Sequence, residues 1–128
     1  MKRMIRQEIV GSARVGYSGD YEIYVNTDDT GKIPHFHIRD RAEWSKFRSC
    51  IRLDCAEYFL HAGKEDTLNA AQRKELQQFM EAEVSQIKYK GKFANNWELC
   101  CFLWDINNSD VVLDDNISMP DYRTLSWR

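Results

Sequence analysis

The sequence predicts an α+β domain, an antiparallel sheet of about four strands with two helices packed on one face. Short segments that alternate apolar and polar residues lie between residues 7 and 57. Two later segments begin with a helix-capping pattern, at Asn69 and Asn95. The 128 residues suit a single domain over 1–128. We expect its core to span about residues 16–105 and a C-terminal tail to span 109–128.

The first two strands are predicted to form a hairpin. Residues 7–17 contain scattered aliphatic residues interrupted by glycines, which predicts a strand. Residues 18–20 read Ser-Gly-Asp, a turn signal. The strand over 21–26 then alternates, so Ile23 and Val25 are expected to face the core.

The third strand carries the pattern Pro-His-Phe-His over residues 34–37. Pro34 cannot donate a backbone hydrogen bond, so it suits the first position of a strand. Because side chains alternate between faces, Phe36 and Ile38 are expected in the core. We expect the opposite face to be half-exposed and to carry His35, His37 and Arg39.

A charged connection over 41–48, which includes Trp44, leads to a predicted fourth strand over 50–57. Its apolar positions alternate with Arg52 and Asp54, as in a half-buried strand. The chain has four cysteines and no Cys-x-x-Cys pair, and we interpret them as reduced, small apolar residues. These cysteines are Cys50, Cys55, Cys100 and Cys101.

The first helix is predicted to begin after Asn69, because Gln72 stands three residues later, at the spacing of a capping box. The apolar residues that follow recur at helical spacing and should form one buried stripe. This stripe consists of Leu76, Phe79, Met80, Val84 and Ile87. Gln77 is expected on the solvent side, and Gly91 should end the pattern.

The second helix is predicted to begin after Asn95, with Glu98 at the same capping spacing. The segment is apolar on nearly every side, which indicates a buried helix, and its tryptophans Trp97 and Trp104 are expected in the core. The pair at 107–108, Asn-Asn, predicts a stop in the left-handed conformation. Aromatic and aliphatic residues in the tail predict that it docks in part.

Composition excludes several classes of protein. The chain is 43% apolar and 30% charged, unlike disordered or membrane proteins. Eighteen basic and 20 acidic residues give a net charge of −2, which argues against nucleic-acid binding. Residues 1–10 are positively charged but lack the apolar stretch of a signal peptide, so we expect a cytoplasmic protein without membrane contact.

The order of these segments resembles a family of small bacterial proteins without an assigned activity, built around a Pro-His-Phe-His motif. The resemblance covers about residues 16–105. Its matching pieces are 21–25, 34–37, 61–63, 68–80 and the Asn-Trp-Glu at 96–98. The family is often encoded in gene pairs that resemble toxin–antitoxin modules. The resemblance therefore implies a partner protein from a neighbouring gene.

Two histidines two residues apart on one strand face suggest a metal site, which needs a third ligand. The candidates on neighbouring segments are His61, Glu22 and Asp54. A divalent metal is the one cofactor that the sequence suggests. The cupin pattern also begins with His-x-His but requires a nearby glutamate, and histidine-triad hydrolases require a third alternate histidine where Arg39 stands.

Three other interpretations stay open for this strand. His35 and His37 could act as acid and base in cleaving a phosphoester or RNA, with Arg39 stabilising the phosphate charge. The same face could bind a partner protein through His35, His37 and Trp44. The two histidines could also be an ordinary pair on an outer sheet face.

Overall fold

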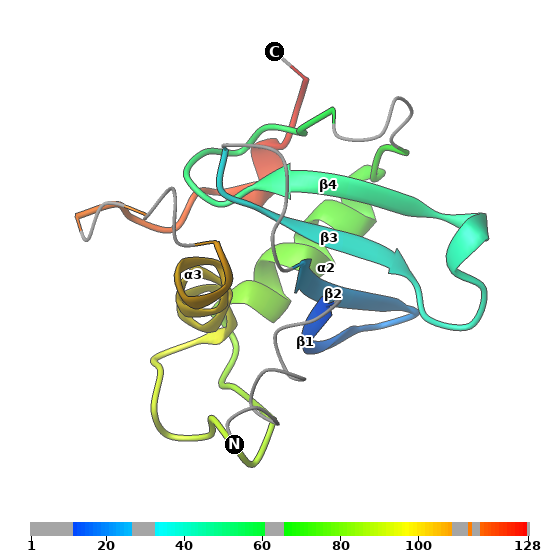
Figure 1. The fold of residues 1–128 in the computed structure, drawn as a ribbon. Helices are drawn as coiled ribbons and strands as arrows, with labels where there is room; N and C mark the ends of the chain where they lie inside the picture. Colours follow the sequence, from blue (N-terminus) through cyan, green and yellow to red (C-terminus); the bar gives the residue numbers. More distant parts are fainter. Residues whose placement is uncertain (1–11, 27–32, 61–65, 109–112, 114–115, 128) are drawn as a thin grey trace.

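The computed structural model describes residues 12–26, 33–60, 66–108, 113 and 116–127. One antiparallel sheet has the order β1-β2-β3-β4, with β1 (Ser12–Ser18), β2 (Tyr21–Asn26), β3 (His35–Asp40) and β4 (Arg48–Arg52). The helices are α2 (Ala70–Glu81) and α3 (Asn96–Asn107), with short 3-10 turns η1 (Trp44–Lys46) and η2 (Tyr122–Thr124). Figure 1 shows α2 behind the sheet and α3 nearly end-on beside it. The predicted α+β class is confirmed.

The strand registers determine which side chains share a face. Gly19 makes the turn of the β1–β2 hairpin with a φ of 60°, a conformation that favours glycine. Tyr24 of β2 pairs with His37 of β3, and His37 pairs with Cys50 of β4. These three side chains therefore form one row across the sheet, on the face opposite Phe36.

The fourth strand is shorter than predicted and starts earlier. It ends at Arg52 rather than at residue 57, because the chain turns there and folds back. The Arg52 guanidinium binds the Asp54 carboxylate across this turn, and the Arg52 N–H donates to the Glu57 carbonyl. Tyr58 then bridges back to Ile51. The alternation over 50–57 thus reflects a strand followed by a compact turn.

Helix α2 begins as predicted and ends earlier. The Asn69 side chain accepts from the Gln72 N–H, and the Gln72 side chain accepts from the Asn69 N–H, which completes the capping box. The helix stops at Glu81, where Ala82 is extended. The Asn96 side-chain amide donates to the Phe79 carbonyl and caps this end.

The expectations for Ile87 and Gln77 are wrong, and Val84 lies outside the helix. Val84 is buried but follows the helix, and Ile87 is 92% exposed. Gln77, expected in solvent, is buried, and its side chain accepts from the Tyr122 N–H at 2.7 Å. The apolar residues keep helical spacing beyond Glu81, so spacing alone could not show where the helix ends. The cap comes from the Asn96 side chain, which the local pattern does not include.

Helix α3 is confirmed, with the Asn95 side chain accepting from the Glu98 N–H. It stops where predicted, but Asn108 has a φ of −137° and is not left-handed. Instead, the Asn108 amide donates to the carbonyls of Asn26 and Trp104. A side chain that bridges to β2 ends this helix, rather than a backbone turn.

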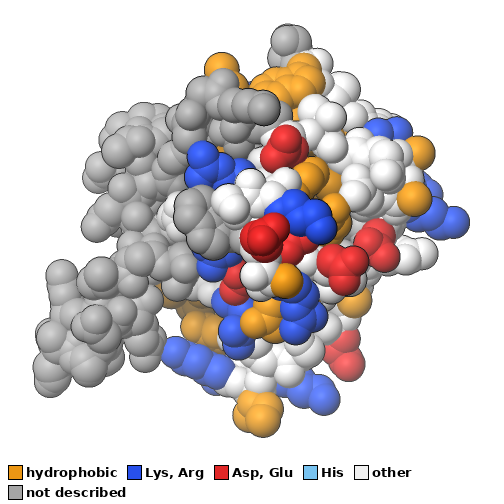
Figure 2. All heavy atoms as spheres, turned by 90° about the vertical axis from the view of Figure 1, so that its right-hand side faces the viewer, with side chains coloured by type: hydrophobic (Ala, Val, Ile, Leu, Met, Phe, Trp, Pro, Cys, Tyr) orange, Lys and Arg blue, Asp and Glu red, His pale blue; other side chains and the backbone are white. Residues whose placement is uncertain are grey.

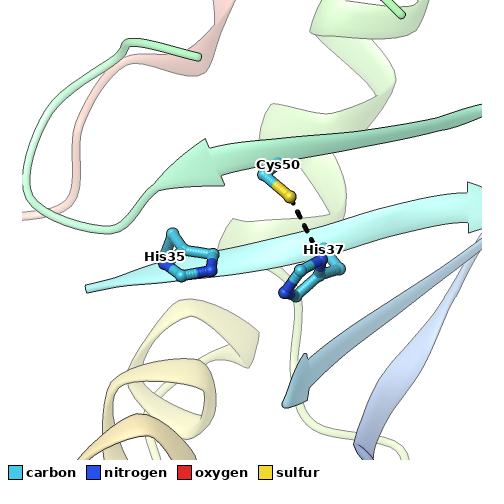
Figure 3. A group of neighbouring side chains, drawn as sticks. All are labelled: His35, His37 and Cys50. Carbon is cyan, nitrogen blue, oxygen red and sulfur yellow. Dashed lines mark hydrogen bonds between the residues drawn. The ribbon is translucent and has the colours of Figure 1, made fainter. Parts of the chain in front are cut away.

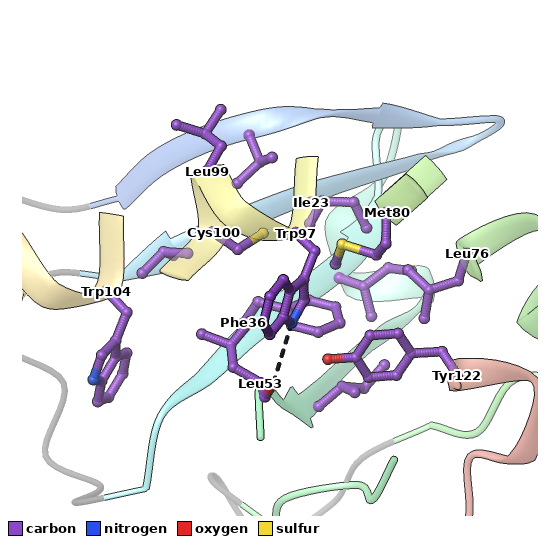
Figure 4. Close-up of a cluster of buried hydrophobic side chains, with 14 of the residues drawn as sticks. Ile23, Phe36, Leu53, Leu76, Met80, Trp97, Leu99, Cys100, Trp104 and Tyr122 are labelled. Carbon is purple, nitrogen blue, oxygen red and sulfur yellow. Dashed lines mark hydrogen bonds between the residues drawn. The ribbon is translucent and has the colours of Figure 1, made fainter. Parts of the chain in front are cut away.

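The core lies between the apolar face of the sheet, the two helices and the tail (Figure 4). Trp97 and Trp104 are buried as predicted, and the Trp97 indole N–H donates to the Leu53 carbonyl. The largest fully buried side chains include Trp104, Tyr122, Phe36, Ile23, Ile38, Ile51, Leu53, Leu76, Met80, Leu99 and Leu103.

The tail contributes to this core. Tyr122 and Leu125 are buried, which confirms that the tail docks. The Tyr122 hydroxyl donates to the Arg52 carbonyl at 2.8 Å, and the ring of Trp127 stacks on that of Tyr58. The tail thus connects α2 to the turn after β4.

The surface has mixed charge on the face drawn in Figure 2. Among the residues coloured there, basic and acidic side chains are interspersed rather than gathered into areas of one sign. Neither α2 nor α3, the helices of the described part of the chain, has the length and apolar character needed to cross a membrane.

Candidate metal centre

The two histidines of β3 are buried, which corrects the expectation of a half-exposed outer face. Their exposed fractions are 0% for His35 and 7% for His37, although Phe36 and Ile38 fill the opposite face as predicted. Aromatic rings cover the imidazoles. The ring centroids of Phe59 and Trp104 lie 4.6 Å and 5.2 Å from that of His35.

Cys50 is the residue that the sequence interpretation missed. Its Sγ lies 3.1 Å from Nδ1 of His37, and it is buried beside both histidines (Figure 3). The nearest ligand atoms of His35, His37 and Cys50 all lie within 4.8 Å of one another. The signal was the hairpin: residues equally far from the point between residues 43 and 44 pair across β3 and β4, which places Cys50 opposite His37.

A backbone carbonyl orients the first imidazole. Nδ1 of His35 lies 2.6 Å from the Ile33 carbonyl oxygen, which only accepts hydrogen bonds. Nδ1 therefore carries a proton, and in the neutral tautomer that this implies the lone pair is on Nε2. Histidines that bind metals commonly donate their other N–H to a carbonyl in this way.

The second imidazole lies between a thiol and an amide. Nε2 of His37 is 3.2 Å from the Asn26 side-chain nitrogen, and Tyr24 stacks on the ring with an interplanar angle of 16°. Half a turn of the Asn26 amide presents its oxygen to Nε2–H. In that tautomer, the lone pair of His37 Nδ1 faces the Cys50 sulfur.

The carboxylates considered as third ligands are engaged by arginines. Glu22 accepts from Arg39 at 2.8 Å, and Asp54 accepts from Arg52 at 2.8 Å. Burial opposes ionisation of Asp54, but its hydrogen bonds with Arg52 outweigh that effect and lower its pKa. Neither carboxylate belongs to the cluster of metal-ligating groups found among the described residues.

The remaining predicted site residues lie apart from the cluster or outside the residues that the structure describes. Arg39 shares the strand face but lies over the Tyr24 ring, 4.4 Å from its centroid, as well as binding Glu22. His61 lies outside the described residues, as does the side chain of Trp44. Their proposed roles stay predictions.

The other cysteines have different surroundings. Burial raises the pKa of Cys55 to about 11 and that of Cys101 to about 12, and it raises the pKa of Cys100 well above its usual range. These three thiols therefore stay protonated at neutral pH. The earlier interpretation as small apolar residues suits them, whereas Cys50 faces an imidazole.

Two imidazoles and one thiolate form a donor set typical of zinc or other thiophilic ions. Tetrahedral zinc, with bonds of about 2.1 Å to nitrogen and about 2.3 Å to sulfur, places neighbouring ligand atoms about 3.5 Å apart. The Cys50 Sγ–His37 Nδ1 distance of 3.1 Å is close to that value, and all three ligand atoms lie within 4.8 Å of one another. Small rotations of the three side chains would suffice to surround an ion.

No family model, curated protein or solved structure matches this chain in comparisons with known proteins.

Proposed function

We propose that this protein binds a thiophilic metal ion, with Zn²⁺ the best suited, through His35, His37 and Cys50. The observation that carries the proposal is the convergence of two imidazoles and a thiol, all buried, within 4.8 Å. A bound ion would contact all three groups at once, in place of the hydrogen bond between Cys50 and His37.

The donor set also argues for the class of metal. Calcium and magnesium prefer oxygen ligands, which the cluster lacks among the described residues. Nonheme iron usually takes two histidines and a carboxylate, but Glu22 is bound to Arg39. Thiolate and imidazole together suit zinc, and a fourth ligand could be water or another small molecule.

Burial of the three ligands supports a tightly held ion. It also argues against His35 and His37 as contacts for a partner protein, since these side chains expose little surface. The partner from a neighbouring gene and the phosphoester-cleaving activity remain separate proposals. Neither draws support from this geometry.

Metal analysis and cobalt substitution test the proposal. We expect about one zinc ion per chain after purification without chelators. Cobalt bound in its place should show intense ligand-field bands and a thiolate charge-transfer band. Cys50→Ser should abolish the charge-transfer band, whereas the control Cys55→Ser should preserve it. Substoichiometric metal, or equal spectra in both variants, would contradict the proposal.

A second candidate function draws on a chain of hydrogen bonds that runs through Cys50 and His37. Cys50, His37 and Asn26 follow one another at 3.1 Å and 3.2 Å, in the order nucleophile, base and orienting amide. In cysteine hydrolases with this order, the thiol gives its proton to the imidazole and attacks an acyl carbon. A thioester forms as the leaving group departs with that proton. Cys50 could therefore act as a nucleophile when no metal is bound.

His35 separates the two candidates, because a metal needs it and the nucleophile does not. We expect His35→Ala to weaken zinc binding. If Cys50 is a nucleophile, chelator-treated His35→Ala protein should still be alkylated by iodoacetamide at Cys50 faster than at Cys55. Mass spectrometry of the peptides locates the modification. Slower labelling of Cys50 than of Cys55 would rule out the nucleophile and leave the metal proposal intact.

A further inference from the structure

A pocket of about 300 Å³ lies away from the histidines, where β1, the segment after α2 and the end of α3 meet. Its size is at the lower end of small-molecule sites. Residues from all three elements line it: Ala13, Arg14, Gln86, Lys88, Tyr89, Leu103, Ile106 and Asn107. It therefore combines cationic, amide and apolar groups in one space.

One wall of this pocket is held in place by a side-chain amide. Gln86 donates to the carbonyls of Arg14 and Val15, at the bulge of the outer strand β1. Arg14 in turn donates to the Tyr17 hydroxyl at 3.0 Å. A guanidinium has five N–H donors, and that bond uses one of them. Arg14 and Lys88 together place positive charge at the pocket.

Asn107 supplies a different kind of group. It is 92% buried, and its Oδ1 has no hydrogen-bond partner among the described residues. A buried acceptor without a partner is unusual and often marks the place of a missing donor. Asn107 is also the last residue of α3, where helix carbonyls carry partial negative charge. Both features favour an amine or hydroxyl.

From this arrangement we propose that the pocket binds a small amphipathic carboxylate that also carries an amine or a hydroxyl, such as an apolar amino or hydroxy acid. Its carboxylate would bind Arg14 and Lys88, and its donor would bind Asn107 Oδ1 after a rotation that turns this buried atom toward the pocket. Its apolar part would pack on Leu103, Ile106 and Tyr89. This site is independent of the proposed metal centre.

Four related probes test which groups of the proposed ligand the pocket recognises. Phenylalanine and phenyllactate carry both polar groups, phenylpropionate lacks the donor, and phenethylamine lacks the acid. Titrations followed by amide NMR should show saturable shifts at the pocket residues. We expect phenylpropionate and phenethylamine to bind about tenfold or more weakly than the better of the first two. Tighter binding of phenylalanine would identify the donor as an amine, and of phenyllactate as a hydroxyl.

Variants connect the shifts to the named residues. Arg14→Gln and Asn107→Leu should each weaken binding about tenfold, whereas Lys92→Gln, an exposed lysine on the same segment but outside the pocket, should not. Arg14→Gln alters an exposed side chain, so it tests the site even if Asn107→Leu fails to fold. Absence of saturable shifts with all four probes, or equal binding by Arg14→Gln and the parent protein, would overturn the proposal.

Discussion

The two faces of strand β3 are both buried, but by different chemistry. Phe36 and Ile38 pack into hydrocarbon formed by the helices and the tail. His35 and His37 lie under aromatic rings and contact a thiol, an amide and a carbonyl. An apolar face is stabilised because its surface is removed from water. A buried imidazole also needs a hydrogen bond or a metal bond at each ring nitrogen.

This difference indicates where stability and function reside. Apolar side chains of similar volume could replace one another on the core face at modest cost. On the histidine face, each substitution would leave a buried polar partner without its bond, which costs more than a lost contact. Residues whose identity matters for chemistry are therefore expected on the second face.

The largest expected effect comes from emptying the core face. Phe36 is fully buried and its ring packs edge-on against Tyr122, with centroids 5.6 Å apart. Phe36→Ala should lower the free energy of unfolding by about 3–5 kcal/mol, since it leaves a cavity. Urea denaturation measures this. The same truncation at Phe102, which is 37% exposed, is the control and should cost clearly less.

A smaller effect is expected from the histidine face when a metal is removed. Zinc at one hundred times its dissociation constant should stabilise the protein by about 2.7 kcal/mol, because it binds only the folded site. Thermal melts with and without a chelator measure the difference. In Cys50→Ala, zinc should leave the melting temperature unchanged. A zinc-dependent shift that persists in this variant would place the ion elsewhere.

The tail provides a third test, with an effect that depends on pH. Burial raises the pKa of the Tyr122 hydroxyl well above its usual value of 10.0. The unfolded chain then ionises first, so this contribution to stability is complete below pH 10.0 and is lost as the pH rises beyond it. Tyr122→Phe should cost about 0.5–1.5 kcal/mol at neutral pH.

Comparison of the two proteins across pH isolates this group. The difference in unfolding free energy between the parent and Tyr122→Phe should shrink above pH 10.0, because the parent alone loses stability through this hydroxyl. Other tyrosines and thiols titrate equally in both. A difference that stays constant to high pH would show that Tyr122 is not sealed from solvent.

The sequence predicted the features that depend on neighbouring residues better than the features that depend on tertiary contacts. Local patterns identified β2, β3 and both helix starts, because alternation and capping involve neighbours in the chain. They failed at the end of α2, where the Asn96 side chain caps the helix from another segment, and at the end of β4, where the chain folds back and Tyr58 bridges to Ile51. Such ends depend on tertiary structure.

The candidate site was predicted only in part for a related reason. His35 and His37 are two residues apart and were found as a pair. Cys50 joins them only through the β3–β4 register, so it was grouped with the other cysteines. Glu22 and Asp54 were plausible ligands by position, but each binds an arginine that the sequence alone did not assign to it.

The smallest expected effect belongs to the outer end of the histidine face, where the Glu22–Arg39 pair borders solvent. Their side chains are 16% and 31% exposed, so water screens the attraction. Glu22→Gln should lower the unfolding free energy by about 0.5 kcal/mol, in the range of partly exposed ion pairs. Adding salt should reduce the difference further. Zinc binding should be unchanged, because Glu22 is not among the proposed ligands. If Glu22→Gln instead abolished zinc binding, the carboxylate would have to be a ligand, and Arg39 would be its partner only in the metal-free protein.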